Sequence, residues 1–218
     1  MREANWGPGR APNSQANWGP GARLILASGS ETRLRLLRDA GLAVEVHPAH
    51  IDEAEIKRSA QAEGASPENC ALLLAELKAA RVARHAPEGL VIAADQLLVC
   101  DDEWFDKPAD LVAARAQLCT LRGRTHRLVT AVLCWRGVAR AWHHIESPRL
   151  AMRAFSDAFL DDYLACEGQS LLGSVGGYRL EGRGAQLFDR VDGDFFSVLG
   201  LPLLPLLGFL RQHGMVRV

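Results

Sequence analysis

The sequence predicts a mixed α/β fold built as one elongated domain, because strand-length apolar runs alternate with segments of helical periodicity. Residues 24–27 and 90–94 are continuous apolar runs, which is typical of buried strands. Between them, apolar residues recur at helical spacing after Ser30 and again after Ser66. With 218 residues, the chain is long enough for one large domain or two small ones that bury a core without disulfides or structural metal.

The first half of the predicted domain carries clear start and stop signals for two helices. Ser30 and Ser66 are natural N-caps, Gly41 is a helix stop, and Pro67 suits the first helical position. In chain order, the expected elements are a strand at 24–27, a helix from Ser30 to Gly41, a strand at 44–47, a polar loop at 51–64 and a helix that opens at Ser66.

The second half begins with a strand at 90–94 that ends in Asp95. A carboxylate at the carboxyl end of a buried strand lies at the edge where α/β sheets bind ligands. The later elements are a strand at 97–100 with a hairpin turn at 101–102, a helix at 111–121, strand-rich segments at 127–135 and 139–152, a helix from Ser156 to 165, a glycine-rich segment at 173–184, a strand at 186–191 and a last helix at 203–212.

The N-terminal 22 residues differ from the rest in composition. Residues 4–9 and 16–21 are the same hexapeptide, Ala-Asn-Trp-Gly-Pro-Gly, and apart from Trp6 and Trp18 little in the segment is able to anchor it. We expect residues 1–22 to be a disordered, mobile tail and residues 23–218 to be the folded domain. A recognition role for the two tryptophans and a bland extension both stay open.

Charge and cysteine usage exclude several classes of protein. The 25 basic residues nearly balance the 26 acidic ones, which argues against a nucleic-acid or membrane-surface protein. The longest apolar stretch, 198–210, is too short to span a bilayer, and the N-terminus lacks the apolar core of a signal peptide. Five cysteines without CxxC spacing favour a reducing compartment. We therefore expect a cytoplasmic protein without a nucleic-acid or membrane partner.

One segment has the geometry of a phosphate cradle. Residues 28–30, Ser-Gly-Ser, join a strand to a capped helix, so that backbone N–H groups, two hydroxyls and the positive end of the helix dipole converge. Arg33 in the first turn favours an anion nearby, because a cation there opposes the dipole. The alternatives are an ordinary capped turn, a turn-capping role for Asp95, and solvent-exposed roles for Glu53 and Lys107. The histidines and cysteines lack the spacing of a zinc site, and no nucleophile elbow is present.

Several short motifs in a fixed order resemble the Maf family. They are Leu26-Ala27-Ser28-Gly29-Ser30 with Arg33, Asp52-Glu53, Lys78, Ala94-Asp95-Gln96, Lys107-Pro108, Leu121-x-Gly123-x-Thr125-His126, Gly177-Tyr178-x-x-Glu181-Gly182 and Gly200-Leu201-Pro202-Leu203. The resemblance covers residues 24–210. It implies an elongated, ITPase-like α/β fold with a central cleft, often dimeric, and an enzyme that converts a nucleoside triphosphate and water to a monophosphate and pyrophosphate.

The resemblance also implies a role for each matching residue. Ser28, Ser30 and Arg33 would bind the triphosphate, and Lys78 and Lys107 would neutralise its charge. Glu53 and Asp95 would serve metal and water. Mg²⁺, or another divalent cation such as Mn²⁺, suits their hard oxygens. Asp95 is the candidate base that orients the attacking water and Glu53 the candidate metal ligand, although the two roles are interchangeable on sequence grounds.

Two departures from the family pattern bear on the substrate. The usual Ser-Pro-Arg-Arg is here Ser30-Glu31-Thr32-Arg33, so one arginine is missing. Gln96 and Glu181 resemble the branch associated with 7-methyl-GTP more than the branch associated with TTP and UTP. A carboxylate accepts from the two adjacent donors of a guanine edge together, which favours Glu181 as a base-binding residue.

Two other functions stay open at this point. A catalytically weak nucleotide-binding regulator of cell division and septum formation would keep the cleft without turnover, and the altered residues at positions 31 and 32 are compatible with it. A phosphatase would release inorganic phosphate instead of pyrophosphate. Retention of both carboxylates, Glu53 and Asp95, together with Lys78 and Lys107, favours the pyrophosphatase.

Overall fold

The structure is a computed structural model that describes residues 18–19 and 21–216. It confirms the mixed α/β class. Within the described residues, eight strands form one sheet with the order β2-β1-β3-β5-β7-β8, in which β4 also pairs with β3 and β6 with β5. The strands are β1 (Leu24–Leu26), β2 (Val44–Val46), β3 (Leu90–Cys100), β4 (Glu103–Phe105), β5 (Thr125–Arg136), β6 (Ala139–Glu146), β7 (Arg149–Met152) and β8 (Phe188–Asp192).

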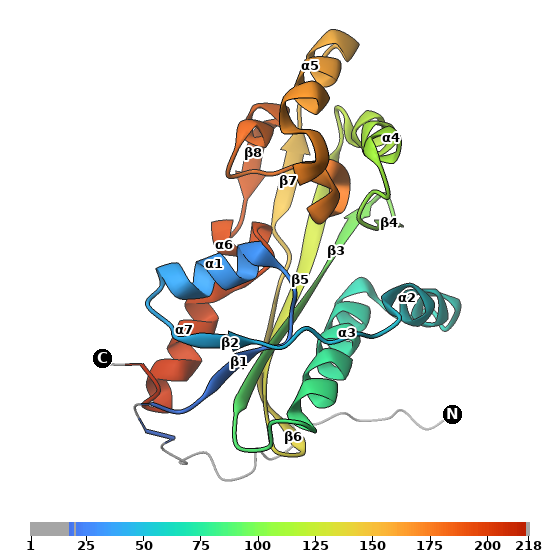
Figure 1. Cartoon of the computed structure of the whole chain (residues 1–218). Coiled ribbons are helices and arrows are strands. Elements are labelled where there is room, and N and C mark those ends of the chain that lie inside the picture. The colour runs from blue at the N-terminus through green and yellow to red at the C-terminus, as the bar shows by residue number, and fades with distance from the viewer. Residues whose placement is uncertain (1–17, 20, 217–218) are drawn as a thin grey trace.

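The helices cover the sheet in two groups (Figure 1). The α-helices are α1 (Glu31–Asp39), α2 (Glu53–Ala62), α3 (Pro67–Ala83), α4 (Leu111–Leu121), α5 (Asp157–Glu167), α6 (Phe195–Val198) and α7 (Leu203–Gln212). Three 3₁₀ helices follow α5, namely η1 (Gly168–Gly173), η2 (Val175–Gly177) and η3 (Arg183–Leu187). The helices α1, α2, α3 and α7 lie around one half of the molecule, whereas α4 and α5 lie at the other end.

Two long strands give the molecule its elongated shape. β3 and β5 pair antiparallel from Leu90 opposite Arg136 to Val99 opposite Arg127, and Figure 1 shows them running through both halves. Apolar residues of α1 and α7 pack against one face of the sheet, and those of α3 against the opposite face. A separate core joins the far ends of β3 and β5 to α4 and α5. The middle of β3 therefore lies between the two halves.

The helices with strong caps form where the sequence predicts them. Ser30 Oγ accepts a hydrogen bond from Arg33 N at 3.4 Å at the start of α1, and Ser66 Oγ accepts one from Asn69 N at 3.2 Å at the start of α3. The helices expected at 111–121 and 203–212 are confirmed as α4 and α7. The segment 139–152 divides into β6 and β7 around Pro148, which has no N–H to donate to a ladder.

The polar loop expected at 51–64 is wrong, because that stretch contains α2. Asp52 is the N-cap, and its Oδ1 accepts from Glu55 N at 3.0 Å. Only Ile56 and Ala60 of this helix pack against the neighbouring apolar core. The apolar stripe is too narrow to be recognised from periodicity alone.

The predicted strand end at Asp95 is also wrong, since β3 continues to Cys100 without a break. Asp95 lies opposite Ala131 of β5 in the middle of the ladder. The neighbouring parallel strand β1 ends at Leu26, opposite Ile92. Asp95 therefore does lie just beyond the carboxyl end of a strand, but that strand is β1.

The N-terminal segment makes its first described contacts at Trp18. The Trp18 ring stacks on His213 with a centroid distance of 4.5 Å and meets Phe209 edge-on at 5.6 Å. The guanidinium of Arg136 lies 4.9 Å from the centre of the same ring. Residues 1–17 and 20, most of the expected tail, are outside the described residues. None of the helices in the described ranges is long and apolar enough to cross a bilayer.

Candidate active site

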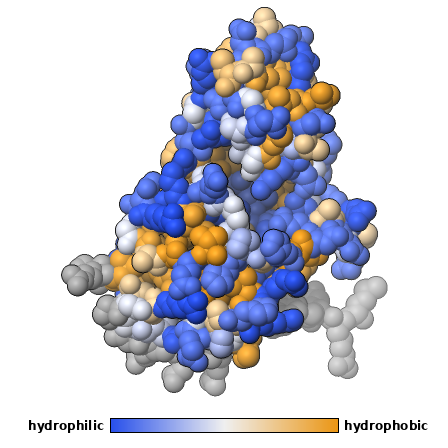
Figure 2. Space-filling view, in the orientation of Figure 1, coloured by the Kyte–Doolittle hydropathy of each residue, from blue (hydrophilic) through white to orange (hydrophobic). Residues whose placement is uncertain are grey.

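A cleft opens where the two halves meet. Its walls come from the β1–α1 turn, α2, α3, the middle of β3, the loop after β4, the glycine-rich segment around η1 and η2, and the α6–α7 junction. Figure 2 shows a hollow on this face of the molecule, lined largely by hydrophilic residues. All nine side chains that the sequence singles out for catalysis or binding line this cleft: Ser28, Ser30, Arg33, Glu53, Lys78, Asp95, Gln96, Lys107 and Glu181.

The β1–α1 turn is arranged by its own hydroxyl groups. Ser30 caps α1, as described above, and Ser28 Oγ accepts from Ser30 N at 3.2 Å. Arg33 Nη1 also donates to Ser28 Oγ at 3.2 Å. The turn is therefore fixed before any ligand arrives, with the N-terminal end of α1 directed at the cleft.

Arg33 joins three segments of the chain at the base of the cleft. Its Nη1 donates to the carbonyl oxygen of Ala94 at 2.9 Å, and its Nε donates to that of Gly200 at 2.8 Å. Burial lowers the pKa of Arg33, and the nearby Asp95 and Glu53 carboxylates partly offset that effect. A Cβ at Gly200 would make only an ordinary contact with the guanidinium at 3.5 Å, so it is the backbone φ of +95° that favours glycine here. Arg33 thus organises the cleft in addition to adding charge.

Lys78 lies between the two carboxylates of the site. Lys78 Nζ is 2.5 Å from Asp95 Oδ1 and 2.8 Å from Glu53 Oε1. Lys78 is 6% exposed and Asp95 is 3% exposed, so this ion pair is buried. Burial raises the pKa of Glu53, but Lys78, Lys57 and Lys107 outweigh it and hold that pKa below its ordinary value. Glu53 is therefore ionised at neutral pH.

The donor set at the carboxylates fits a divalent cation. Asp95 Oδ2 is buried and has no hydrogen-bond partner, which is costly unless a ligand or water meets it. Within the described residues, no group of three or more acidic, histidine or cysteine side chains forms a complete metal site. Mg²⁺ is commonly held by one or two carboxylates together with water and substrate phosphates. Glu53 and Asp95 supply that number of protein ligands.

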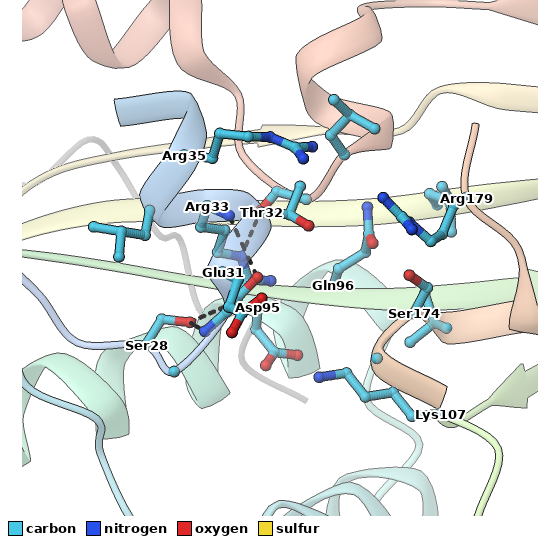
Figure 3. Close-up of a pocket in the computed structure, with 18 of the residues that line it drawn as sticks. Ser28, Glu31, Thr32, Arg33, Arg35, Asp95, Gln96, Lys107, Ser174 and Arg179 are labelled. Carbon is cyan, nitrogen blue, oxygen red and sulfur yellow. Dashed lines mark hydrogen bonds between the residues drawn. The ribbon is translucent and has the colours of Figure 1, made fainter. Parts of the chain in front are cut away.

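Lys107 reaches the site from the loop after β4. Figure 3 shows Lys107 and Ser28 on either side of Asp95. Burial lowers the pKa of Lys107, and the neighbouring cations Arg33 and Lys78 add to this effect, opposed by Glu53 and Asp95. In the described part of the chain, Lys107 forms no ion pair within 4.0 Å, because none of the salt bridges includes it. It is therefore a cation whose charge is available to an anionic ligand.

Gln96 presents an acceptor to the cleft. Its Nε2 donates to Thr130 Oγ1 at 2.8 Å and to the carbonyl oxygens of Ser197 and Val198 at 2.9 and 3.2 Å. These bonds fix the amide group with its nitrogen bonded to protein acceptors. Oε1 accepts no hydrogen bond from the residues that the structure describes, and it lies near Gly200.

Glu181 lies at the other side of the cleft between two arginines. Its Oε1 is 3.4 Å from Arg35 Nη2 and 3.6 Å from Arg179 Nε. Arg35 belongs to α1, so the pair links this helix to the segment between η2 and η3. Sequence reasoning missed Arg35, Arg179 and also Lys57, which lines the cleft from α2. Lys57 follows Glu53 by four residues, a spacing that would have identified it if α2 had been expected as a helix.

Comparison with known proteins identifies close relatives. Over residues 23–213 the chain matches the family described as Maf-like protein. It is 58% identical over 196 residues, 90% of this chain and 100% of the other, to a nucleoside triphosphate pyrophosphatase of Granulibacter bethesdensis. It is 54% identical to a protein of the same name from Paramagnetospirillum magneticum, over 87% of this chain and 98% of that one. It is 45% identical to a 7-methyl-GTP pyrophosphatase of Mesorhizobium japonicum, over 89% of this chain and 98% of that one.

Among solved structures, a dITP/XTP pyrophosphatase from Mycobacterium abscessus aligns with 68% of this chain and 95% of its own, at 16% identity and a TM-score of 0.39. That similarity is too weak to add to the fold described above.

Proposed function

The chain belongs to the Maf family, and from this premise we propose that it hydrolyses nucleoside triphosphates to nucleoside monophosphates and pyrophosphate, in the cytoplasm. The observation that carries the proposal is the buried Asp95 carboxylate in the cleft, with Oδ1 bound to Lys78 and Oδ2 without a hydrogen-bond partner among the described residues. The five cysteines of the chain are free thiols, which suits a reducing compartment. A homodimer and a role in septum formation are further expectations from the family resemblance.

The site suits attack of water on the α-phosphorus. Asp95 Oδ2 would accept a proton from the attacking water and orient it, a contribution of about 10²- to 10⁴-fold. The N-terminal end of α1 and the cation of Lys107 would meet the charge that develops on the phosphates. Glu53 would hold Mg²⁺ or Mn²⁺, and the two carboxylates would exchange these roles if Asp95 is the metal ligand. When bound, such a cation supplies further positive charge to the phosphates.

Product analysis tests this function. The purified protein is incubated with GTP and Mg²⁺, and pyrophosphate, inorganic phosphate and the nucleotide products are measured, with a chelator control. We expect GMP and pyrophosphate. Release of GDP and phosphate would identify a phosphatase instead. Nucleotide binding without either product would identify the regulatory alternative.

The variant Asp95→Asn tests the role of the carboxylate, because it keeps the size of the side chain and removes its charge. We expect pyrophosphate release to fall by about 10²- to 10⁴-fold, while nucleotide binding by calorimetry is largely retained. Asp161→Asn is the matched control, since Asp161 is exposed on α5 and pairs with Arg115 at 3.0 Å. Unchanged activity in Asp95→Asn would contradict the assignment.

We also propose a preference for guanine nucleotides, with 7-methyl-GTP as the favoured substrate. Gln96 Oε1 and the Glu181 carboxylate are acceptors on the cleft wall, and a guanine edge offers two adjacent donors. Arg35 and Arg179 form ion pairs with the Glu181 carboxylate and orient it. Turnover of 7-methyl-GTP, GTP, CTP, UTP and TTP is compared for the wild type and Glu181→Gln. A wild-type preference for UTP or TTP would refute this assignment.

A further inference from the structure

An ion pair closes one rim of the cleft. Lys57 Nζ lies 2.5 Å from Asp106 Oδ1 and joins α2 to a loop 49 residues further along the chain. Only 13% of the Lys57 side chain is exposed, compared with 63% of the Asp106 side chain. A lysine that is this deeply buried needs a partner for its charge. We call this pair the Lys57–Asp106 clasp.

The clasp connects the two elements that carry functional side chains. Lys57 lies one helical turn after Glu53 on α2. Asp106 directly precedes Lys107, and its carbonyl oxygen accepts a hydrogen bond from Gln117 Nε2 of α4 at 2.9 Å. The loop is therefore held at Asp106 from both sides, by a side-chain contact with α2 and a backbone contact with α4.

Charge makes the clasp necessary for Lys107. Burial lowers the pKa of Lys57, but Asp106, Asp95 and Glu53 raise it to a value above that of an ordinary lysine, so Lys57 is charged. Lys107 is surrounded by Arg33 and Lys78 as well as the carboxylates, and no described residue forms an ion pair with it. Repulsion from these cations favours a position of Lys107 further out in solvent. Attraction to Glu53 and Asp95 and the position of its loop oppose that movement.

We propose that the Lys57–Asp106 clasp is a positioning device that holds Lys107 in the cleft to meet the triphosphate. This inference rests on the proposed function. Lys57 also neutralises Asp106, whose exposed carboxylate would otherwise repel an anionic substrate at the rim of the cleft.

A set of variants tests the clasp through its two partners. Lys57→Met removes the ammonium and keeps an unbranched stem, and Asp106→Asn removes the carboxylate charge. We expect each to lower kcat/KM by about 10- to 100-fold, the cost of misplacing a reacting group by about an ångström, and the double variant to lose no more than either one. Asp161→Asn is the control for loss of an exposed ion pair and should retain wild-type kcat/KM.

The sign of the Asp106→Asn effect separates positioning from direct contact. If Lys57 contacts the phosphates itself, Asp106→Asn frees a cation and removes a repelling charge, so activity is unchanged or higher. Either result overturns the proposal. The Lys57→Met substitution is repeated in a Lys107→Met background. If the clasp acts through Lys107, Lys57→Met should cause no further loss of kcat/KM there. Losses of kcat/KM that add independently in the double variant would overturn the proposal.

The pH profile supplies a readout that simple destabilisation does not move. A Lys107 that moves away from Arg33 and Lys78 titrates at higher pH, so the alkaline limb of kcat/KM should shift upward in Asp106→Asn. Loss of a negative charge without movement would shift that limb downward, which would contradict the proposal. Melting temperatures are recorded for every variant, and a fall in stability with unchanged kcat/KM also overturns it.

Binding measurements keep this test separate from the proposed function. Absence of pyrophosphate release by the wild type would refute the function alone. The affinity of the same variants for α,β-methylene-GTP, which is not hydrolysed at that position, is then measured by calorimetry. A weaker affinity of about tenfold or more in both Lys57→Met and Asp106→Asn supports the clasp, and unchanged affinity overturns it.

Discussion

Removal of Lys78 is expected to destabilise the fold as well as the activity. The Lys78 and Asp95 side chains are only 8% and 5% exposed and lie 2.5 Å apart. At an effective dielectric constant of about 20, that contact is worth roughly 7 kcal/mol of Coulomb energy, much of which offsets the desolvation of the two ions. Lys78→Met leaves Asp95 buried without a counter-ion. We expect a loss of about 3–5 kcal/mol in the free energy of unfolding, a large share of the roughly 5–15 kcal/mol of a typical domain.

Urea unfolding followed by circular dichroism measures this loss. The double variant Lys78→Met/Asp95→Asn should recover most of the stability, because it removes the unpaired charge, yet stay inactive. Arg115→Met is the control, since the exposed Arg115–Asp161 pair should contribute less than about 1 kcal/mol. A Lys78→Met protein as stable as the wild type at pH 8 would refute the reasoning.

Three further predictions concern Lys107, His126 and Gly200. The alkaline limb of kcat/KM should lie below pH 10.5, because burial and nearby cations lower the pKa of Lys107, and Lys107→Arg should move that limb upward in a pH–rate profile. Burial lowers the pKa of His126 to about 4 from 6.5. The stability that the neutral imidazole contributes should therefore be fully present above pH 6.5 and be lost as pH falls, by about 3 kcal/mol at pH 4. Urea titrations measure this loss, which should be smaller in His126→Gln. Gly200→Ala should cost about 1 kcal/mol or more, because φ is +95° there. Relief of that strain should shift the Gly200 carbonyl oxygen that Arg33 binds and so lower pyrophosphate release; wild-type stability and rate would contradict it.

The sequence predicted most of the fold where the signal is local. Ser30 and Ser66 are recognisable in the sequence as N-caps of α1 and α3, and the side-chain oxygen of each accepts the expected hydrogen bond. That β3 continues past Asp95 could not be predicted from a local signal of this kind. Asp95 and Gln96 interrupt the apolar run, and the strand is held together by pairing with β5, a partner about 35 residues away in the chain. Such pairing leaves no trace in a short window of sequence.

The candidate site was predictable as a set of residues but not as a network. The nine predicted side chains do line one cleft, and the family resemblance supplied their grouping. Their ion pairs depend on contacts between distant segments, such as Lys78 of α3 with Asp95 of β3. Lys57 escaped notice for a different reason. Only Ile56 and Ala60 mark the inner face of α2, so the helical spacing that relates Lys57 to Glu53 could not be recognised.

The ion pairs decide which cations are able to attract a triphosphate. Among the described side chains that line the cleft, lysines and arginines outnumber carboxylates by one, so the cleft is nearly neutral, like the whole chain. Lys78, Lys57 and Arg179 are already paired with carboxylates. Lys107 is not, and Arg33 is bound to neutral carbonyl oxygens and a hydroxyl that leave its charge uncompensated at short range. Under the proposed function, attraction of the substrate would depend on cations without a carboxylate partner, of which Lys107 and Arg33 lie nearest Asp95, and on a metal that would offset Glu53 and Asp95. A device that fixes the position of Lys107 consequently has a larger effect on catalysis than its place at the rim of the cleft suggests.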